Sequence, residues 1–163
     1  MAHSDCKNGT IMNTQKRTRK ILVHGLILVM VGLVWGFFVP HTPYPRLALG
    51  AHIQLITNGI LFIIMAVLLT TLPHRVGAKS LGVMLLAVWL TWAMGMSEVG
   101  NAWWGATQML PIAGDQAGAK GGLAWHELFI KLTHIAAGLG LVAAWILLIL
   151  GFLKCPDAAG SSQ

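Results

Sequence analysis

Charged residues are scarce in this sequence. Only 10% of its 163 residues are Asp, Glu, Lys or Arg, and only five of them are acidic, whereas about a quarter of the residues in an ordinary soluble domain are charged. Hydrophobic residues make up 56% of the chain, and the mean hydropathy is +0.71. This composition excludes an ordinary soluble domain and indicates an integral membrane protein.

The familiar motifs of soluble enzymes are also absent. The sequence contains no phosphate-binding loop, no catalytic serine elbow, no HExxH and no Cys-x-x-Cys. Its two cysteines, Cys6 and Cys155, lie in polar terminal segments, so neither a disulfide nor a thiolate metal site is expected. No nucleic-acid motif accompanies the net charge of +6, and we therefore expect no nucleic-acid partner.

The apolar residues are gathered in four segments close to the length of about 18 to 20 residues that spans a bilayer. They are residues 21–39, 48–72, 81–96 and 128–153. Each is predicted to be a helix, because helices satisfy their backbone hydrogen bonds internally in lipid. We predict an all-α, multi-pass protein of the bacterial inner membrane, with one four-helix transmembrane domain (21–154), a basic cytoplasmic tail (1–20) and a short cytoplasmic tail (155–163).

The distribution of lysine and arginine predicts the orientation of this bundle. If both termini are cytoplasmic, most basic residues lie at the inner ends of the helices, and only Arg46 and Lys120 lie outside. The inner residues are Lys7, Lys16, Arg17, Arg19, Lys20, Arg75, Lys79 and Lys154. The excess of positive charge inside favours the N-in, C-in topology.

Three polar residues interrupt the apolar segment PRLALGAHIQLITNG (Pro45 to Gly59): His52, Gln54 and Asn58. On a helix, Gln54 and Asn58 share a face, whereas His52 and Asn58 point about 120° apart. A site shared between helices or subunits would use both directions. His52 alone fits either a neutral imidazole bonded to a carbonyl or a ligand of a metal or haem iron.

Further polar residues occur near the ends of the third and fourth apolar segments. Glu127, Lys131 and His134 share one helical face, which favours either a Glu127–Lys131 salt bridge with a snorkelling lysine or the polar lining of a cavity. Glu98 and Asn101 are expected at the membrane interface, exposed to water.

Two features of the first helix have packing interpretations. Gly32 and Gly36 form a GxxxG-like pair, which predicts close contact with a neighbouring helix. His24 lies near the inner end of the helix, where we expect it to be a packing or surface residue.

The segment PRLALGAHIQLITNG, together with His24-Gly25 opening a glycine-containing helix, resembles the small four-helix membrane family of hydroxylaminobenzene mutases and styrene oxide isomerases. The resemblance extends over roughly residues 24–101. It implies a homotrimer that holds ferric haem b between subunits, with His52 as the axial ligand of the iron. It also implies that Asn58 lies in the substrate pocket and that Asn101 matches a further asparagine of the site.

The resemblance favours the mutase branch. The isomerase branch uses a tyrosine from the third helix, and the one tyrosine here, Tyr44, lies in the first loop. The implied reaction is the intramolecular rearrangement of a small aromatic hydroxylamine, such as hydroxylaminobenzene, to 2-aminophenol, with the iron as a Lewis acid. This reaction is redox-neutral, so no electron-transfer partner is required.

Three alternatives stay open at this point. The first is epoxide isomerisation of the styrene oxide type. The second is a non-catalytic b-type cytochrome with His52 and His134 as haem ligands. The third is a membrane scaffold without a cofactor.

Overall fold

The computed structural model describes the backbone of residues 2–154 and the side chains of residues 14–154. All regular structure in this part of the chain is helical, and the helices long and apolar enough to cross a membrane number four. They are α1 (Ala2–Gly36, with the candidate membrane span at Thr14–Gly36), α2 (Pro45–Thr71), α3 (Ala78–Trp104) and α5 (Ala124–Leu153). The predicted four-span, all-α architecture is confirmed. Cys155 and the predicted tail 155–163 lie outside the described residues, as does the side chain of Cys6.

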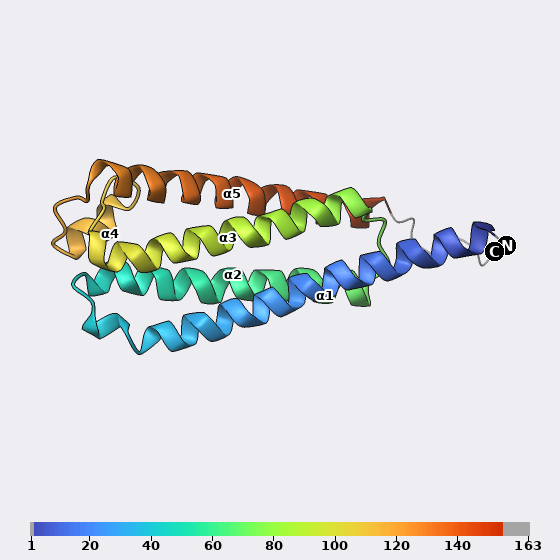
Figure 1. Cartoon of the computed structure of the whole chain (residues 1–163), viewed down its shortest axis with the longest axis horizontal. Helices are drawn as coiled ribbons and strands as arrows, with labels where there is room; N and C mark the ends of the chain where they lie inside the picture. Colours follow the sequence, from blue (N-terminus) through green and yellow to red (C-terminus); the bar gives the residue numbers. More distant parts are fainter. Residues whose placement is uncertain (1, 155–163) are drawn as a thin grey trace.

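The four long helices form two pairs (Figure 1). α1 packs closely along α2, and α3 packs closely along α5. α2 and α3 join the two pairs, whereas α2 and α5 are not among the closely packed helices. α1 begins and α5 ends at the same end of the bundle, as an even number of spans requires. Which side of the membrane this end faces stays a prediction.

Proline and glycine determine where the helices end. α1 stops at Gly36, earlier than predicted, and a short 3-10 helix, η1 (Val39–His41), leads to Pro45 at the first turn of α2. Proline is favoured there because its missing N–H has no partner in a first turn. α3 runs on to Trp104 and ends at Gly105, whose φ of 64° is the left-handed conformation common after a helix.

The glycine pair in α1 lets α2 approach closely, as predicted. A Cβ added to Gly32 would lie 2.8 Å from Cγ1 of Ile56 and 3.0 Å from Cβ of Leu55. A Cβ added to Gly36 would lie 2.9 Å from Cε1 of His52. Small residues at both positions therefore bring the backbone of α1 against the first half of α2.

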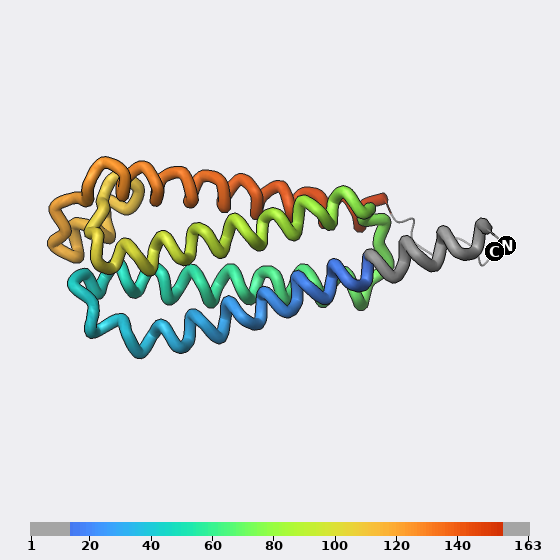
Figure 2. The backbone as a smooth tube through the Cα atoms, in the orientation of Figure 1, coloured from blue at the N-terminus to red at the C-terminus, as the bar shows by residue number. Residues whose placement is uncertain are grey.

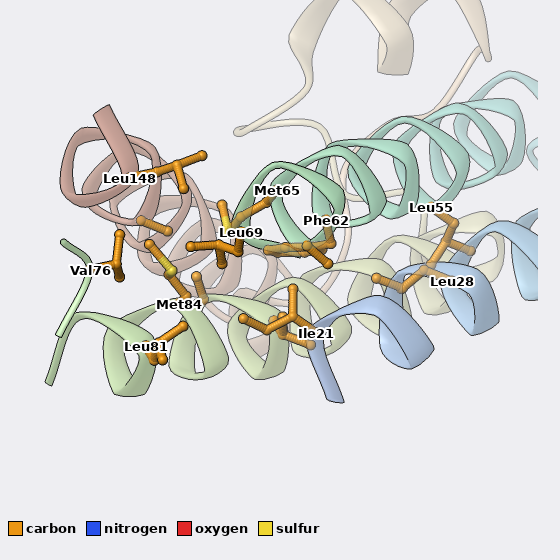
Figure 3. Close-up of a cluster of buried hydrophobic side chains, with 14 residues drawn as sticks. Ile21, Leu28, Leu55, Phe62, Met65, Leu69, Val76, Leu81, Met84 and Leu148 are labelled. Carbon is orange, nitrogen blue, oxygen red and sulfur yellow. The ribbon is translucent and has the colours of Figure 1, made fainter. Parts of the chain in front are cut away.

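The buried core is apolar and draws on all four long helices (Figure 3). Ile21, Phe62, Met84 and Leu148 are each at most 1% exposed. Large apolar side chains on the outer surface are well exposed, with Leu139 at 68%, as suits contact with lipid acyl chains.

The connection between α3 and α5, residues 105–123, contains a short helix, α4 (Pro111–Gln116), that the sequence analysis did not predict. We call this connection the cap, because it folds over the end of the bundle where α3 ends and α5 begins (Figure 2). α4 contacts α2, and Nε of Arg46 donates a hydrogen bond of 2.7 Å to Oε1 of Gln116. The cap is thus attached to both halves of the bundle.

Candidate active site

His52 lies where α2 faces α1. Its ring contacts Gly36, and its Nδ1 lies 2.7 Å from the carbonyl oxygen of Gly32. A carbonyl oxygen can only accept, so Nδ1 carries the proton and donates. In the neutral ring, Nε2 is then left with its lone pair.

This geometry is the one that a histidine ligand of a metal adopts. Such a histidine usually donates from one ring nitrogen to a carbonyl or carboxylate, which fixes the tautomer and aims the other nitrogen at the metal. Among the residues that the structure describes, Nε2 of His52 has no hydrogen-bond partner. Both sequence interpretations of His52 are therefore compatible: it bonds a carbonyl, and it keeps one nitrogen free to act as a ligand.

Asn58 lies on another face of α2, as helical geometry predicted. It is 5% exposed, and its Nδ2 donates a hydrogen bond of 3.3 Å to Oε1 of Gln54. The two carboxamides therefore adjoin, and Gln54 constrains the orientation of Asn58. Oδ1 of Asn58 and its second N–H make no further hydrogen bond within the described residues.

Asn58 and Gln54 line a pocket of about 190 Å³ between α2, α3 and α5. A single benzene ring fits an apolar cavity of roughly 150 Å³, so this pocket has room for a monocyclic aromatic compound with a small substituent. The rest of its wall is mainly apolar. The other lining residues are Thr91, Met94, Met109, His134, Ala137, Gly138 and Leu141.

Asn101 is placed differently from Asn58. It is 1% exposed, its Nδ2 donates 3.1 Å to the carbonyl of Ala106, and its Oδ1 accepts 2.7 Å from the N–H of Ala106. The expected exposure to water at the interface is wrong, because the cap covers this end of α3. Asn101 does not line the pocket. Its catalytic role stays a prediction, while its hydrogen bonds hold the start of the cap.

Glu127 also holds the cap. Its carboxylate accepts hydrogen bonds of 2.9 to 3.0 Å from the N–H groups of Thr107, Gln108 and Gly122. The expected Glu127–Lys131 salt bridge is wrong: Glu127 is buried, and Lys131 is exposed with no ion pair in the described part of the chain. Three backbone donors satisfy the carboxylate better than one mobile lysine would.

His134 pairs with Glu98 across the α3–α5 interface. Nε2 of His134 lies 2.7 Å from Oε1 of Glu98, and its Nδ1 lies 2.8 Å from the carbonyl of Ile130. Glu98 is 2% exposed, so the prediction of a water-exposed Glu98 is wrong, whereas a polar cavity lining by His134 is confirmed. The signal for this pair was present in the sequence as two ionisable residues within apolar helices.

His24 packs edge-on against Trp89, with ring centroids 5.1 Å apart. The packing interpretation of His24 is confirmed. Tyr44 lies against Gly105 at the end of α3, and it does not line the pocket.

No cluster of three or more His, Cys, Asp or Glu side chains suited to a metal ion occurs in the described part of the chain. His52 can thus offer one imidazole. A single imidazole suits an iron that receives its remaining ligands from a prosthetic group, as haem iron does.

Comparison with known proteins finds a matching family model and two similar proteins. A family model described as styrene oxide isomerase matches residues 17–153. Hydroxylaminobenzene mutase HabA of Ectopseudomonas oleovorans is 32% identical over 135 residues, which cover 82% of this chain and 97% of that protein. Hydroxylaminobenzene mutase HabB of the same organism is 29% identical over 139 residues, covering 85% and 82%. No solved structure matches the chain.

Proposed function

Because the chain belongs to the styrene oxide isomerase family, we propose that this membrane isomerase is a haem-dependent mutase that rearranges an arylhydroxylamine to an aminophenol. Two curated relatives bear the name hydroxylaminobenzene mutase. The proposed substrate is accordingly a hydroxylaminobenzene, and the proposed product is 2-aminophenol.

The observation that carries the proposal is the hydrogen bonding of His52. Its Nδ1 is committed to the carbonyl of Gly32 at 2.7 Å, so Nε2 is the nitrogen that would hold the iron of ferric haem b. Bound there, haem would supply a Lewis acid that can polarise an N–O bond.

Asn58 is proposed to orient the reacting heteroatoms. Its carboxamide donates and accepts without a change of charge, so it can bond both the N–H and the hydroxyl oxygen of a hydroxylamine. Gln54 holds Asn58 through the 3.3 Å hydrogen bond, which reduces the number of side-chain conformations that Asn58 can adopt. The function of Gln54 in this proposal is therefore positional.

The apolar part of the pocket is proposed to hold the aromatic ring. Met94, Ala137 and Leu141 supply this surface, which excludes water from the reacting carbon. When water is excluded, the hydroxyl group that leaves nitrogen is the one that bonds to the ring carbon, and solvent does not supply that oxygen.

The two halves of the site point in different directions within one subunit, because His52 faces α1 and Asn58 faces the α2–α5 pocket. We propose that the His52 surface of one subunit meets the Asn58 pocket of its neighbour. The assembly proposed from the resemblance is a homotrimer, in which one kind of contact forms a closed ring.

Epoxide isomerisation is the second candidate, favoured by the description of the matching family model. A tyrosine in α3 would support it, but the single tyrosine, Tyr44, lies against Gly105 and outside the pocket. A bis-histidine cytochrome is disfavoured, because both ring nitrogens of His134 are engaged by Glu98 and Ile130.

The direct test gives phenylhydroxylamine to membranes that contain the protein, in water labelled with heavy oxygen. We expect 2-aminophenol that carries the unlabelled oxygen of the substrate. Absence of 2-aminophenol would refute the mutase proposal, and labelled product would refute intramolecular transfer. Styrene oxide supplied in a parallel reaction measures the second candidate.

A pair of variants separates haem binding from turnover. His52→Ala is expected to lose the haem absorbance and the activity together, whereas Asn58→Ala is expected to keep the haem and lose turnover. His24→Ala is the matched control, because His24 packs on Trp89 and neither residue lines the pocket of Asn58. Full haem content in His52→Ala would show that another residue holds the iron.

A further inference from the structure

Glu98 and His134 form a buried pair that holds one proton between them. The carbonyl of Ile130 can only accept, so Nδ1 of His134 carries a hydrogen. The contact of 2.7 Å between Nε2 and Oε1 then requires one proton, either on the imidazole or on the carboxyl group. The pair is neutral as a unit in both cases, which makes its burial in the bundle tolerable.

The second oxygen of Glu98 lacks a partner. Oε2 is buried and makes no hydrogen bond within the described residues. The other buried side-chain atoms in that state are the indole nitrogens of Trp92 and Trp145, which donate and cannot accept. Since an unsatisfied buried carboxylate oxygen is unfavourable, a bound molecule with an N–H or O–H group would be stabilised there.

The pair adjoins the pocket that holds Asn58 through His134, whereas Glu98 itself is not among the residues that line this pocket. His134 lines the pocket directly. Glu98 follows Thr91 and Met94, two further lining residues of α3, at the spacing that places all three on one helical face. Glu98 therefore lies one helical turn beyond Met94 on this face of α3, and a substrate must extend past Met94 to reach Oε2.

The proposed rearrangement requires a proton to move. The N–O bond of the hydroxylamine breaks, and a C–O bond forms at the ortho carbon with the same hydroxyl. The C–H bond at that carbon breaks, and nitrogen gains one N–H bond. The net result is the transfer of one proton from the ortho carbon to nitrogen, with no oxidant or reductant. A positioned side chain can carry that proton.

We propose that Oε2 of Glu98 takes the ortho proton and returns it to the nitrogen of the substrate. Glu98 is then a catalytic residue, and His134 is a positioning residue that fixes the carboxylate through Oε1. This inference rests on the proposed mutase function. It assigns a task to two residues that neither haem ligation nor orientation by Asn58 uses.

A neighbouring hydrogen bond provides the matched control. Oγ of Ser97 lies 2.8 Å from Oγ1 of Thr133, so this pair joins α3 to α5 one residue before the Glu98–His134 pair. Neither Ser97 nor Thr133 lines the pocket. A role of Glu98 limited to joining the helices would make its loss resemble the loss of Ser97.

The experiment compares wild type, Glu98→Gln, Glu98→Asp and Ser97→Ala as purified holoproteins. The substrates are phenylhydroxylamine and phenylhydroxylamine with deuterium at both ortho positions. Glu98→Gln is expected to lower kcat by about 100-fold or more with KM changed less than about threefold, because a general acid–base group contributes on that scale. The isotope effect on kcat should rise above the wild-type value, and Ser97→Ala should match wild type in both measurements.

Glu98→Asp provides a second test in case the Glu98→Gln protein does not fold. It keeps a carboxylate but withdraws it by one methylene group, so a smaller loss of kcat with a raised isotope effect is expected. If the folded Glu98 variants match Ser97→Ala in kcat and isotope effect, the proposed proton transfer is wrong. A wild-type protein that makes no 2-aminophenol overturns the mutase function itself, and this role with it, so the two failures are distinguishable.

Discussion

Mixed oligomers test whether two subunits share one site. His52 and Asn58 are six positions apart on α2, which corresponds to about 9 Å along the helix axis and about 120° around it. The structure directs His52 toward Gly32 and Asn58 toward the α2–α5 pocket. One subunit alone therefore presents the proposed iron ligand and the substrate pocket on different faces.

The perturbation is co-expression of His52→Ala subunits and Asn58→Ala subunits that carry different affinity tags. Purification through both tags retains only oligomers that contain both kinds. In a closed trimer with one type of contact, every such oligomer has one contact that joins an intact His52 to an intact Asn58. We therefore expect about one third of the wild-type activity per trimer, although each parent alone is inactive.

The assay measures 2-aminophenol formation and haem content in the same doubly purified sample. About half of the wild-type haem should remain, because one or two of three subunits retain His52. Co-expression of His52→Ala with the double variant His52→Ala/Asn58→Ala is the control and should stay inactive. Mixed oligomers that bind haem but are as inactive as their parents would show that one subunit supplies both residues. A recovery of one half would indicate a dimer.

Two further predictions concern residues that hold His52 and the cap in place. Gly36→Ala should lower haem content strongly, because its Cβ would lie 2.9 Å from Cε1 of His52. Gly50→Ala is the control and should keep haem at the wild-type level, because a Cβ there would have no neighbour within 4 Å. The haem absorbance of the purified proteins measures this, and normal haem content in Gly36→Ala would contradict the predicted effect of the contact. Glu127→Ala should lower the free energy of unfolding by about 3 kcal/mol, since three backbone N–H groups lose their acceptor. Thermal unfolding in detergent measures this loss of stability. Lys131→Ala should leave stability unchanged, because Lys131 is exposed. Equal losses of stability in Glu127→Ala and Lys131→Ala would instead support the salt-bridge interpretation.

The transmembrane helices could be predicted because their signal is local. An apolar stretch of bilayer length is helical in lipid regardless of its neighbours, and the polar interruptions of α2 could be assigned to helical faces by counting residues. Gln54 next to Asn58 and His52 on another face are both observed. Each of these conclusions required only the sequence of a single helix.

The cap could not be predicted, because its contacts join distant parts of the chain. Hydropathy places Glu98, Asn101 and Glu127 where helices leave the membrane, and a polar residue at that depth is ordinarily exposed to water. The structure buries all three, since the cap brings backbone N–H groups to Glu127 and Asn101, and α5 brings His134 to Glu98. No pattern within one helix encodes these partners.

The polar groups of the cap and of the candidate site differ in how much of their hydrogen-bonding capacity the fold uses. Asn101 has both ends of its carboxamide bonded to Ala106, and Glu127 accepts from three backbone donors, so these residues are committed to the cap. Nε2 of His52 and Oε2 of Glu98 are instead left without a partner in the described part of the chain. Oε2 of Glu98 is buried, and a folded chain rarely leaves a buried polar atom unsatisfied. His52 is only partly buried, so its Nε2 is both free and accessible. Iron is assigned to Nε2 and substrate to Oε2. If ligand binding protected the cap while leaving the surroundings of His52 and Glu98 unchanged in hydrogen exchange, that division between structural and reactive groups would be wrong.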